Sequence, residues 1–86
     1  MEEFVTYILY SEKFDKIYIG FSSHLIERIY SHNVYATKGY TRKYRPWIVI
    51  NVDFFKTKKE ALSREKWLKS GIGRKFIKTT ILPHWK

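Results

Sequence analysis

Tyrosine, arginine, histidine and glutamate side chains occur in this sequence at spacings that suit chemistry on a phosphodiester. Tyr7 and Tyr18 lie in apolar, β-branched runs, and Arg28 and His32 follow one helical turn apart. Glu65 lies much later, within a helical apolar pattern. A phenol can lie near an attacking water, a guanidinium can neutralise charge on phosphate oxygens, and a carboxylate can hold a divalent metal ion. His32 can act as a relay or an orienting group.

Each of these residues also has a purely structural interpretation. Tyrosines in strands are usually packing residues, and a phenol with a free pKa of about 10 is a poor base at neutral pH. Arg28 can pair with a nearby glutamate, and His32 can interact with a helix dipole. Glu65 can pair with Lys69, four residues further on. Taken one at a time, these residues favour the structural interpretation.

The length and composition indicate one domain, over residues 1–86. No apolar run approaches the roughly 20 residues that a membrane span needs, so we expect no membrane segment. The sequence contains no cysteine, which excludes disulfides and thiolate metal sites. A cytoplasmic protein of undetermined oligomeric state is the expectation.

The charge balance is the most informative bulk property. Lys and Arg number 17 against 8 Asp and Glu, a formal net charge of +9. Such an excess favours a polyanionic partner, with DNA first and RNA as an alternative. The basic residues are spread along the chain and not gathered on one amphipathic helix, which argues against a membrane surface. The remaining alternative is a basic domain with no polyanionic partner.

The first half of the chain reads as a hairpin followed by a helix. Residues 4–10 and 16–21 are rich in β-branched and aromatic side chains, and the polar stretch between them is short enough for a hairpin loop. Ser22 or Ser23 can cap a helix that ends near Asn33. The sequence leaves open whether Tyr7 and Tyr18 share one face of the sheet, because this depends on register.

The second half supplies a third strand and at least one more helix. Residues 34–46 read as irregular, and residues 47–55 as a strand. Thr57 and Glu60 form a capping box for a helix to about Lys69, with Gly71 as its stop. Residues 74–82 fit a short helix or strand. The expected fold is α+β, a three-stranded antiparallel sheet flanked by helices in the order β-β-α-β-α-α, with a core over about 4–70 and a C-terminal element over 72–86.

A stretch before the third strand alternates cations with aromatic rings. Cations on such a segment can track phosphates, and neighbouring rings can stack on exposed bases. In the alternative interpretation, Tyr44 and Trp47 pack the start of the strand while the cations are only solvated. The residues of this stretch that we predict to contact nucleic acid are Lys38, Tyr40, Arg42, Lys43 and Arg45.

The ordered set of candidate residues resembles the GIY-YIG nuclease superfamily, above all its small, stand-alone bacterial members. The resemblance covers about residues 4–70. Its parts are Tyr7, Tyr18-Ile19-Gly20, Arg28, His32-Asn33, Tyr40-Thr41, Arg45-Pro46-Trp47, Glu60-Ala61-Leu62 and Arg64-Glu65-Lys66.

The resemblance implies a divalent-metal-dependent DNA endonuclease. By similarity, Tyr18 is the candidate general base and Tyr7 assists it. Arg28 matches the arginine at the scissile phosphate, and His32 matches a position held by histidine or tyrosine. Glu65 matches the ligand of a single Mg²⁺ or Mn²⁺ ion. Gly20 and Asn33 are expected to be structural parts of the motif, with Gly20 letting the substrate backbone come close.

Two departures qualify this expectation. Val5 and Thr6 replace the glycine and isoleucine of the first motif. The chain also has no room for the separate DNA-binding domain of larger members, so structure-selective or weakly specific cutting, in DNA repair or processing, is expected. Two alternatives stay open: a non-catalytic nucleic-acid-binding module that retains the fold, and a protein–protein adaptor.

Overall fold

The computed structural model describes residues 4–30, 33 and 39–85. Its sheet has three antiparallel strands in the order β2-β1-β3. The predicted α+β fold with a three-stranded antiparallel sheet and flanking helices is therefore confirmed. The elements are β1 (Phe4–Ser11), β2 (Lys16–Ser22), α1 (Leu25–Tyr30), α2 (Tyr40–Lys43), β3 (Ile48–Phe55), α3 (Lys58–Lys69), α4 (Gly71–Phe76), η2 (Ile77–Ile81) and α5 (Leu82–Trp85).

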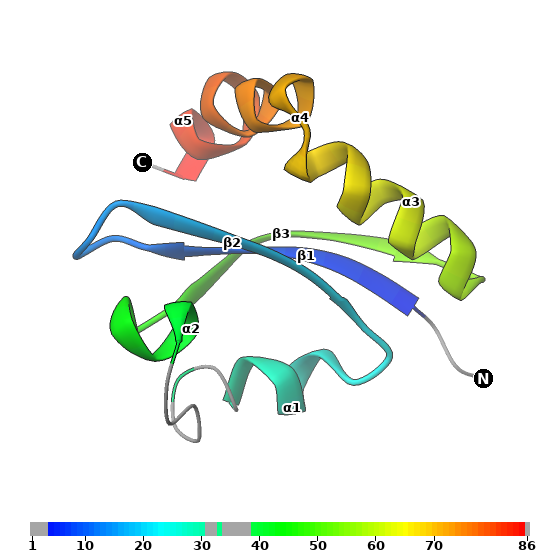
Figure 1. Cartoon of the computed structure of the whole chain (residues 1–86), viewed down its shortest axis with the longest axis horizontal. Coiled ribbons are helices and arrows are strands. Elements are labelled where there is room, and N and C mark those ends of the chain that lie inside the picture. Colours follow the sequence, from blue (N-terminus) through cyan, green and yellow to red (C-terminus); the bar gives the residue numbers. More distant parts are fainter. Residues whose placement is uncertain (1–3, 31–32, 34–38, 86) are drawn as a thin grey trace.

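The central strand β1 is buried on both of its faces. Every residue of β1 after Phe4 is buried, which fits its nearly continuous apolar and β-branched sequence. The helices lie in two layers, with α3, α4 and α5 on one side of the sheet and α1 and α2 on the other (Figure 1). Alternate residues of β1 therefore contribute to two separate cores.

The two cores divide the strand residues by face. On the side of α1, Val5, Tyr7 and Leu9 pack with Trp47. On the side of α3, Ile8 and Ile19 pack with residues of α3 and η2. The candidate residues of β1 and β2 thus belong to the face that α1 and α2 cover.

The helix α3 is fixed to the sheet by its cap and by a buried hydroxyl. Thr57 accepts a hydrogen bond from the backbone N–H of Glu60 at 3.2 Å, as the capping box predicts. Thr6, on the α3 side of β1, donates from its hydroxyl to the carbonyl oxygen of Ala61 at 2.6 Å. This bond holds the first turns of α3 against the centre of the sheet.

The prediction that Gly71 stops this helix is wrong. The helix ends at Lys69, and Ser70 serves both as its C-cap and as the N-cap of α4, where its hydroxyl accepts from the N–H of Gly73 at 3.2 Å. Gly71 is the first residue of α4. The C-terminal stretch, predicted as helix or strand, is helical through α4, η2 and α5.

The segment predicted as irregular before β3 contains a helical turn. Its residues 34–38 lie outside the described part of the chain. The turn α2 follows Gly39, whose φ of 89° is a conformation that favours glycine. This turn places Tyr40 beside β2, because its hydroxyl donates to the carbonyl oxygen of Ile17 at 3.0 Å.

Candidate active site

Strand register puts the two candidate phenols on one face of the sheet. Tyr7 lies opposite Gly20, and Leu9 lies opposite Tyr18. Because paired residues share a face and alternate residues of a strand do too, Tyr7 and Tyr18 are diagonal neighbours. Their ring centroids are 6.3 Å apart with an interplanar angle of 34°. The question that the sequence left open is settled in favour of a shared face.

Gly20 makes room for the phenol of Tyr7. A Cβ atom at position 20 would lie 2.6 Å from the Tyr7 hydroxyl oxygen and 3.1 Å from the Tyr18 ring. The prediction that Gly20 leaves space for a substrate backbone therefore needs correction, because the nearest atoms belong to the chain's own tyrosines. Because Gly20 has no side chain, the Tyr7 ring can lie against its backbone, next to the ring of Tyr18.

The two tyrosines differ in accessibility. Tyr7 has 0% of its surface exposed, whereas Tyr18 is half-buried. The Tyr18 ring is tilted against Tyr40 at 6.5 Å and against Trp47 at 6.2 Å between centroids. Tyr18 can therefore touch a bound molecule, and Tyr7 can act only through its neighbours.

Burial raises the pKa of the Tyr7 phenol. The neighbouring Tyr18 and the charge of Glu65 raise this pKa further, while a hydrogen bond and the positive charge from Arg28 lower it by less. Tyr7 is thus a neutral phenol at neutral pH. The same interactions put Arg28, Tyr18 and Glu65 in one electrostatic neighbourhood around its hydroxyl.

Arg28 reaches this neighbourhood from α1. Before the helix, the Ser22 hydroxyl accepts from the N–H of His24 at 2.8 Å, and the His24 carbonyl accepts from the N–H of Arg28 at 3.1 Å. Leu25 of α1 packs against the core on the Tyr7 side of the sheet. The Arg28 residue is exposed, so its guanidinium can contact both the buried Tyr7 and a molecule in solvent.

Glu65 comes from α3, on the other side of the sheet. It lies between the fully buried Ala61 and Leu68 in the helical repeat, and its side chain is only 19% exposed. Its carboxylate lies 3.7 Å from the Lys69 ammonium, so the structural pairing considered from the sequence is present. The pairing does not exclude a metal-binding role, because a carboxylate offers two oxygens.

The remaining predicted residues fall into two groups. His32 and Lys38 lie outside the described residues. Asn33 is structural, as expected: its side chain donates to the Trp47 carbonyl at 3.0 Å and accepts from the Trp47 N–H at 2.6 Å. This pair of bonds fixes the start of β3 relative to Asn33.

The predicted nucleic-acid contacts are partly used inside the protein. Arg45 donates to the backbone carbonyl of Asn33 at 3.3 Å. Lys43 and Arg42 are exposed, and the Lys43 ammonium lies 5.3 Å from the centroid of the Tyr44 ring. Tyr44 packs against the core, so the packing interpretation holds for this ring, while the two exposed cations stay accessible to a polyanion.

The metal prediction depends on Glu65 alone. Among residues 4–30, 33 and 39–85, no group of three histidine, aspartate, glutamate or cysteine side chains is arranged to hold a metal ion. One protein carboxylate with water and substrate phosphate is ordinary coordination for Mg²⁺. A half-buried carboxylate in the electrostatic neighbourhood of Tyr7 and Arg28 fits such an ion.

Sequence reasoning missed two residues beside this site. Arg74 and Lys78 line a pocket together with Tyr18. Their spacing of four residues gave a signal, since it puts both on one side of a helix.

No helix in the described part of the chain is long and apolar enough to cross a membrane.

Comparison with known proteins identifies the family. Residues 3–76 match the family model of the GIY-YIG catalytic domain. The chain is also 37% identical over 57 residues to the UPF0213 protein CPE1444 of Clostridium perfringens (strain 13 / Type A). That alignment covers 66% of this chain and 61% of the relative, so the chain spans about three fifths of the length of the relative it matches. No solved structure matches the chain.

Proposed function

The chain belongs to the GIY-YIG nuclease family, and on that premise we propose that it is a divalent-metal-dependent DNA endonuclease. The observation that carries the proposal is that Tyr18 and Arg28 lie beside the buried Tyr7 hydroxyl, which also experiences the charge of Glu65. These side chains come from four different elements, β2, α1, α3 and β1. The packing of these elements does not by itself require these four side chains. The reaction would be hydrolysis of a phosphodiester by in-line attack of water.

The two accessible residues, Tyr18 and Arg28, would have different roles in the reaction at the phosphate. Tyr18 is the half-buried phenol and would hold the attacking water, as a general base or an orienting group. Arg28 is exposed and would donate to the phosphate oxygens that gain charge. Tyr7 would stay neutral and position the Arg28 guanidinium. The His32 role as a relay stays a prediction.

Glu65 would hold the metal ion. A Mg²⁺ or Mn²⁺ ion bound there would neutralise charge that grows on the phosphate and the leaving oxygen. The Glu65 side chain is 19% exposed, so its carboxylate is partly buried and still open to solvent. Structure-selective or weakly specific cutting in DNA repair or processing, and a cytoplasmic location, belong to the same proposal.

The experiment is a nicking assay on supercoiled plasmid with Mg²⁺ or Mn²⁺. Wild type is expected to convert the plasmid to its open form, and EDTA to stop the reaction. The Glu65→Gln and Tyr18→Phe variants should be slower by about 10² or more. Lys66→Gln is the matched control, since this exposed neighbour of Glu65 lies outside the proposed site. Equal rates for Glu65→Gln and wild type would contradict the proposal.

A second candidate function is binding without catalysis. The formal net charge of +9 and the exposed cations Arg42 and Lys43 support it, because neither depends on Glu65. It predicts salt-sensitive binding to DNA or RNA that neither EDTA nor Glu65→Ala changes. Absence of any product from duplex, branched and single-stranded substrates, together with such binding, would favour it over the endonuclease.

A further inference from the structure

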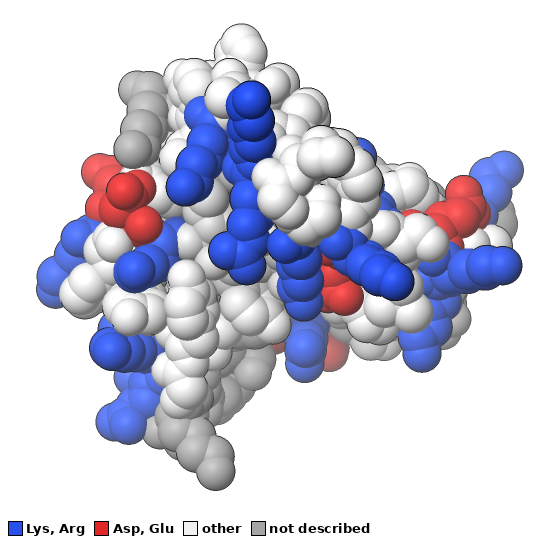
Figure 2. All heavy atoms as spheres, turned by 45° about the horizontal axis from the view of Figure 1, so that its top comes forward, with Lys and Arg blue, Asp and Glu red and all other residues white. Residues whose placement is uncertain are grey.

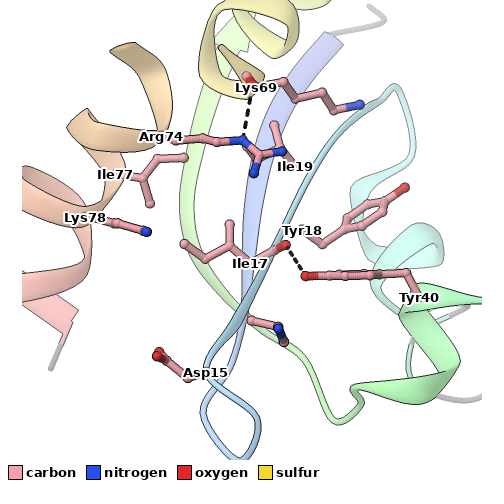
Figure 3. A pocket seen from close by; sticks show the side chains of 10 residues that line it. Asp15, Ile17, Tyr18, Ile19, Tyr40, Lys69, Arg74, Ile77 and Lys78 are labelled. Carbon is pink, nitrogen blue, oxygen red and sulfur yellow. Dashed lines mark hydrogen bonds between the residues drawn. The ribbon is translucent and has the colours of Figure 1, made fainter. Parts of the chain in front are cut away.

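A pocket of about 450 Å³ straddles the exposed edge of β2 beside the candidate active site. Its lining takes residues from both faces of this edge strand, Tyr18 from one and Ile17 and Ile19 from the other. Figure 3 shows the α4 and η2 side chains on one side of the strand and Tyr40 on the other. A pocket of this size suits a small molecule or a single nucleotide unit.

Positive charge dominates the lining. Lys16, Lys69, Arg74 and Lys78 line the pocket, and Asp15 is the single acidic residue among the described residues that line it. Figure 2 likewise shows much more Lys and Arg surface than acidic surface on the face that it draws. The pocket therefore suits an anion.

The guanidinium in this pocket is held in place. The Nε atom of Arg74 donates to the carbonyl oxygen of Lys69 at 3.2 Å, and the Lys78 ammonium lies on the same side of β2 as the Arg74 guanidinium (Figure 3). A guanidinium fixed in this way loses little further freedom when it meets a phosphate. Arg74 and Lys78 thus form a prepared phosphate contact.

The opposite wall offers an aromatic ring that is also fixed. Tyr40 is 44% exposed, its hydroxyl donates to the Ile17 carbonyl, and its ring stacks on Trp47 at 5.7 Å with an interplanar angle of 26°. Exposed, immobile aromatic rings are the surfaces on which unpaired bases stack. The pocket therefore combines a phosphate contact and a base contact.

The pocket is continuous with the candidate active site. Tyr18 belongs to both, and Lys69 lines the pocket while its ammonium lies 3.7 Å from Glu65. A strand whose phosphate lies at Arg28 and Glu65 would pass directly over the edge of β2. Its next nucleotide would then lie at the pocket.

We propose that this pocket receives one unpaired nucleotide of the cleaved strand, with its phosphate at Arg74 and Lys78 and its base against Tyr40. The position of the cut phosphate rests on the proposed function. A base must leave its partner before it can enter such a pocket, and this costs least where the strand is already single. The preferred substrate class is therefore DNA with a single-stranded flap or extension at the cut site.

The test measures DNA binding by fluorescence anisotropy in EDTA, so that no cleavage intervenes. The probes are a blunt duplex and the same duplex with a single-stranded extension at either end. Wild type is expected to bind one extended duplex about tenfold more tightly, within the range for stacking one base. Lys78→Gln and Tyr40→Ala should each reduce this preference to about threefold or less.

The control variant is Lys75→Gln, which removes the same charge from an exposed neighbour that does not line the pocket. It should weaken binding to both probes alike and keep the preference. Equal binding of blunt and extended duplexes by wild type overturns the proposal, and so does an equal loss of preference in Lys75→Gln and Lys78→Gln.

The outcome is separable from that of the proposed function. If the plasmid assay shows no cleavage but the binding preference depends on Lys78 and Tyr40, the pocket assignment stands and the endonuclease proposal fails. If the chain cuts plasmid while binding both probes equally, the endonuclease proposal stands and the pocket assignment fails.

Discussion

At the scale of single residues, the structure gives the two candidate tyrosines different surroundings. Tyr7 is fully buried beneath Gly20, and burial raises the pKa of its hydroxyl. Tyr18 is the one that a bound molecule can touch. Tyr7 is therefore best described as a positioning residue whose hydroxyl acts on Arg28.

The buried phenol predicts a loss of stability at alkaline pH. Because the pKa of Tyr7 is higher in the folded state, the unfolded chain releases this proton first, near pH 10. The stabilisation is thus complete below about pH 10 and is lost as pH rises toward the folded pKa, by up to about 1.4 kcal/mol per pH unit. Urea unfolding at pH 9 to 11 should show a steeper fall for wild type than for Tyr7→Phe. Parallel curves would contradict the assignment.

The close contact at Gly20 predicts a costly Gly20→Ala change. The added methyl group would lie 2.6 Å from the Tyr7 oxygen, and the buried ring has little room to retreat. We expect a loss of about 1–3 kcal/mol in the free energy of unfolding, as for overpacking elsewhere. In a double-mutant cycle with Tyr7→Leu, which removes both the oxygen and the ring carbon at 2.7 Å, the two losses measured by chemical denaturation should sum to more than the loss of the double variant. Fully additive losses would count against the contact.

At the scale of elements, the site depends on helices held close to a three-stranded sheet. A Cβ atom at Gly73 would clash with the Trp67 carbonyl oxygen and would lie 2.5 Å from the Leu68 Cα atom. Because these are backbone atoms, no side-chain rotation can relieve the clash. The approach of α4 to α3, which brings Arg74 to the Lys69 carbonyl, therefore requires a glycine at this position.

This approach is testable with two glycines of the same helix. Gly73→Ala should lower the free energy of unfolding by about 1–3 kcal/mol or more, because α4 must move away from α3. Gly71→Ala is the matched control: no atom of the described residues lies within 4 Å of its added Cβ, and a gain of up to about 1 kcal/mol is expected. Thermal unfolding of both variants measures the contrast. Similar effects at the two positions would contradict the packing described.

The elements themselves were largely predictable, because their signals are local. The three strands, the Thr57 cap and the end of α3 at Lys69 followed from residue type and spacing. The helix break did not, because Ser70 can cap two helices at once and Gly71 looked like the stronger stop. The turn α2 was also missed. Its Tyr40 is held by the carbonyl oxygen of Ile17 in β2, a contact that a local sequence pattern does not reveal.

The site was predictable in its members and not in its geometry. Residue order supplied Tyr7, Tyr18, Arg28 and Glu65, but the shared face of the phenols needed the register of β1 against β2. The role of Gly20 needed the position of the Tyr7 ring. The pocket at the edge of β2 joins residues far apart in the sequence, so no local pattern predicted it.

At the scale of the whole molecule, positive charge is the dominant property. A formal net charge of +9 sets up long-range attraction to a polyanion, which salt screens. Binding of a short DNA duplex should weaken linearly in a plot of log affinity against log salt concentration. The double variant Arg42→Gln and Lys43→Gln should reduce the slope by about 2, close to one for each phosphate that these two cations neutralise. An unchanged slope would show that these exposed cations do not bind DNA.

In the proposed function, side chains from four elements form one metal-dependent site. The most direct measurement is the anomalous diffraction of crystals grown with saturating Mn²⁺, which locates the ion without reference to activity. We expect a manganese peak within bonding distance of a Glu65 carboxylate oxygen, on the side that faces Tyr18 and Arg28. Full occupancy elsewhere, or an empty site beside Glu65, would contradict it.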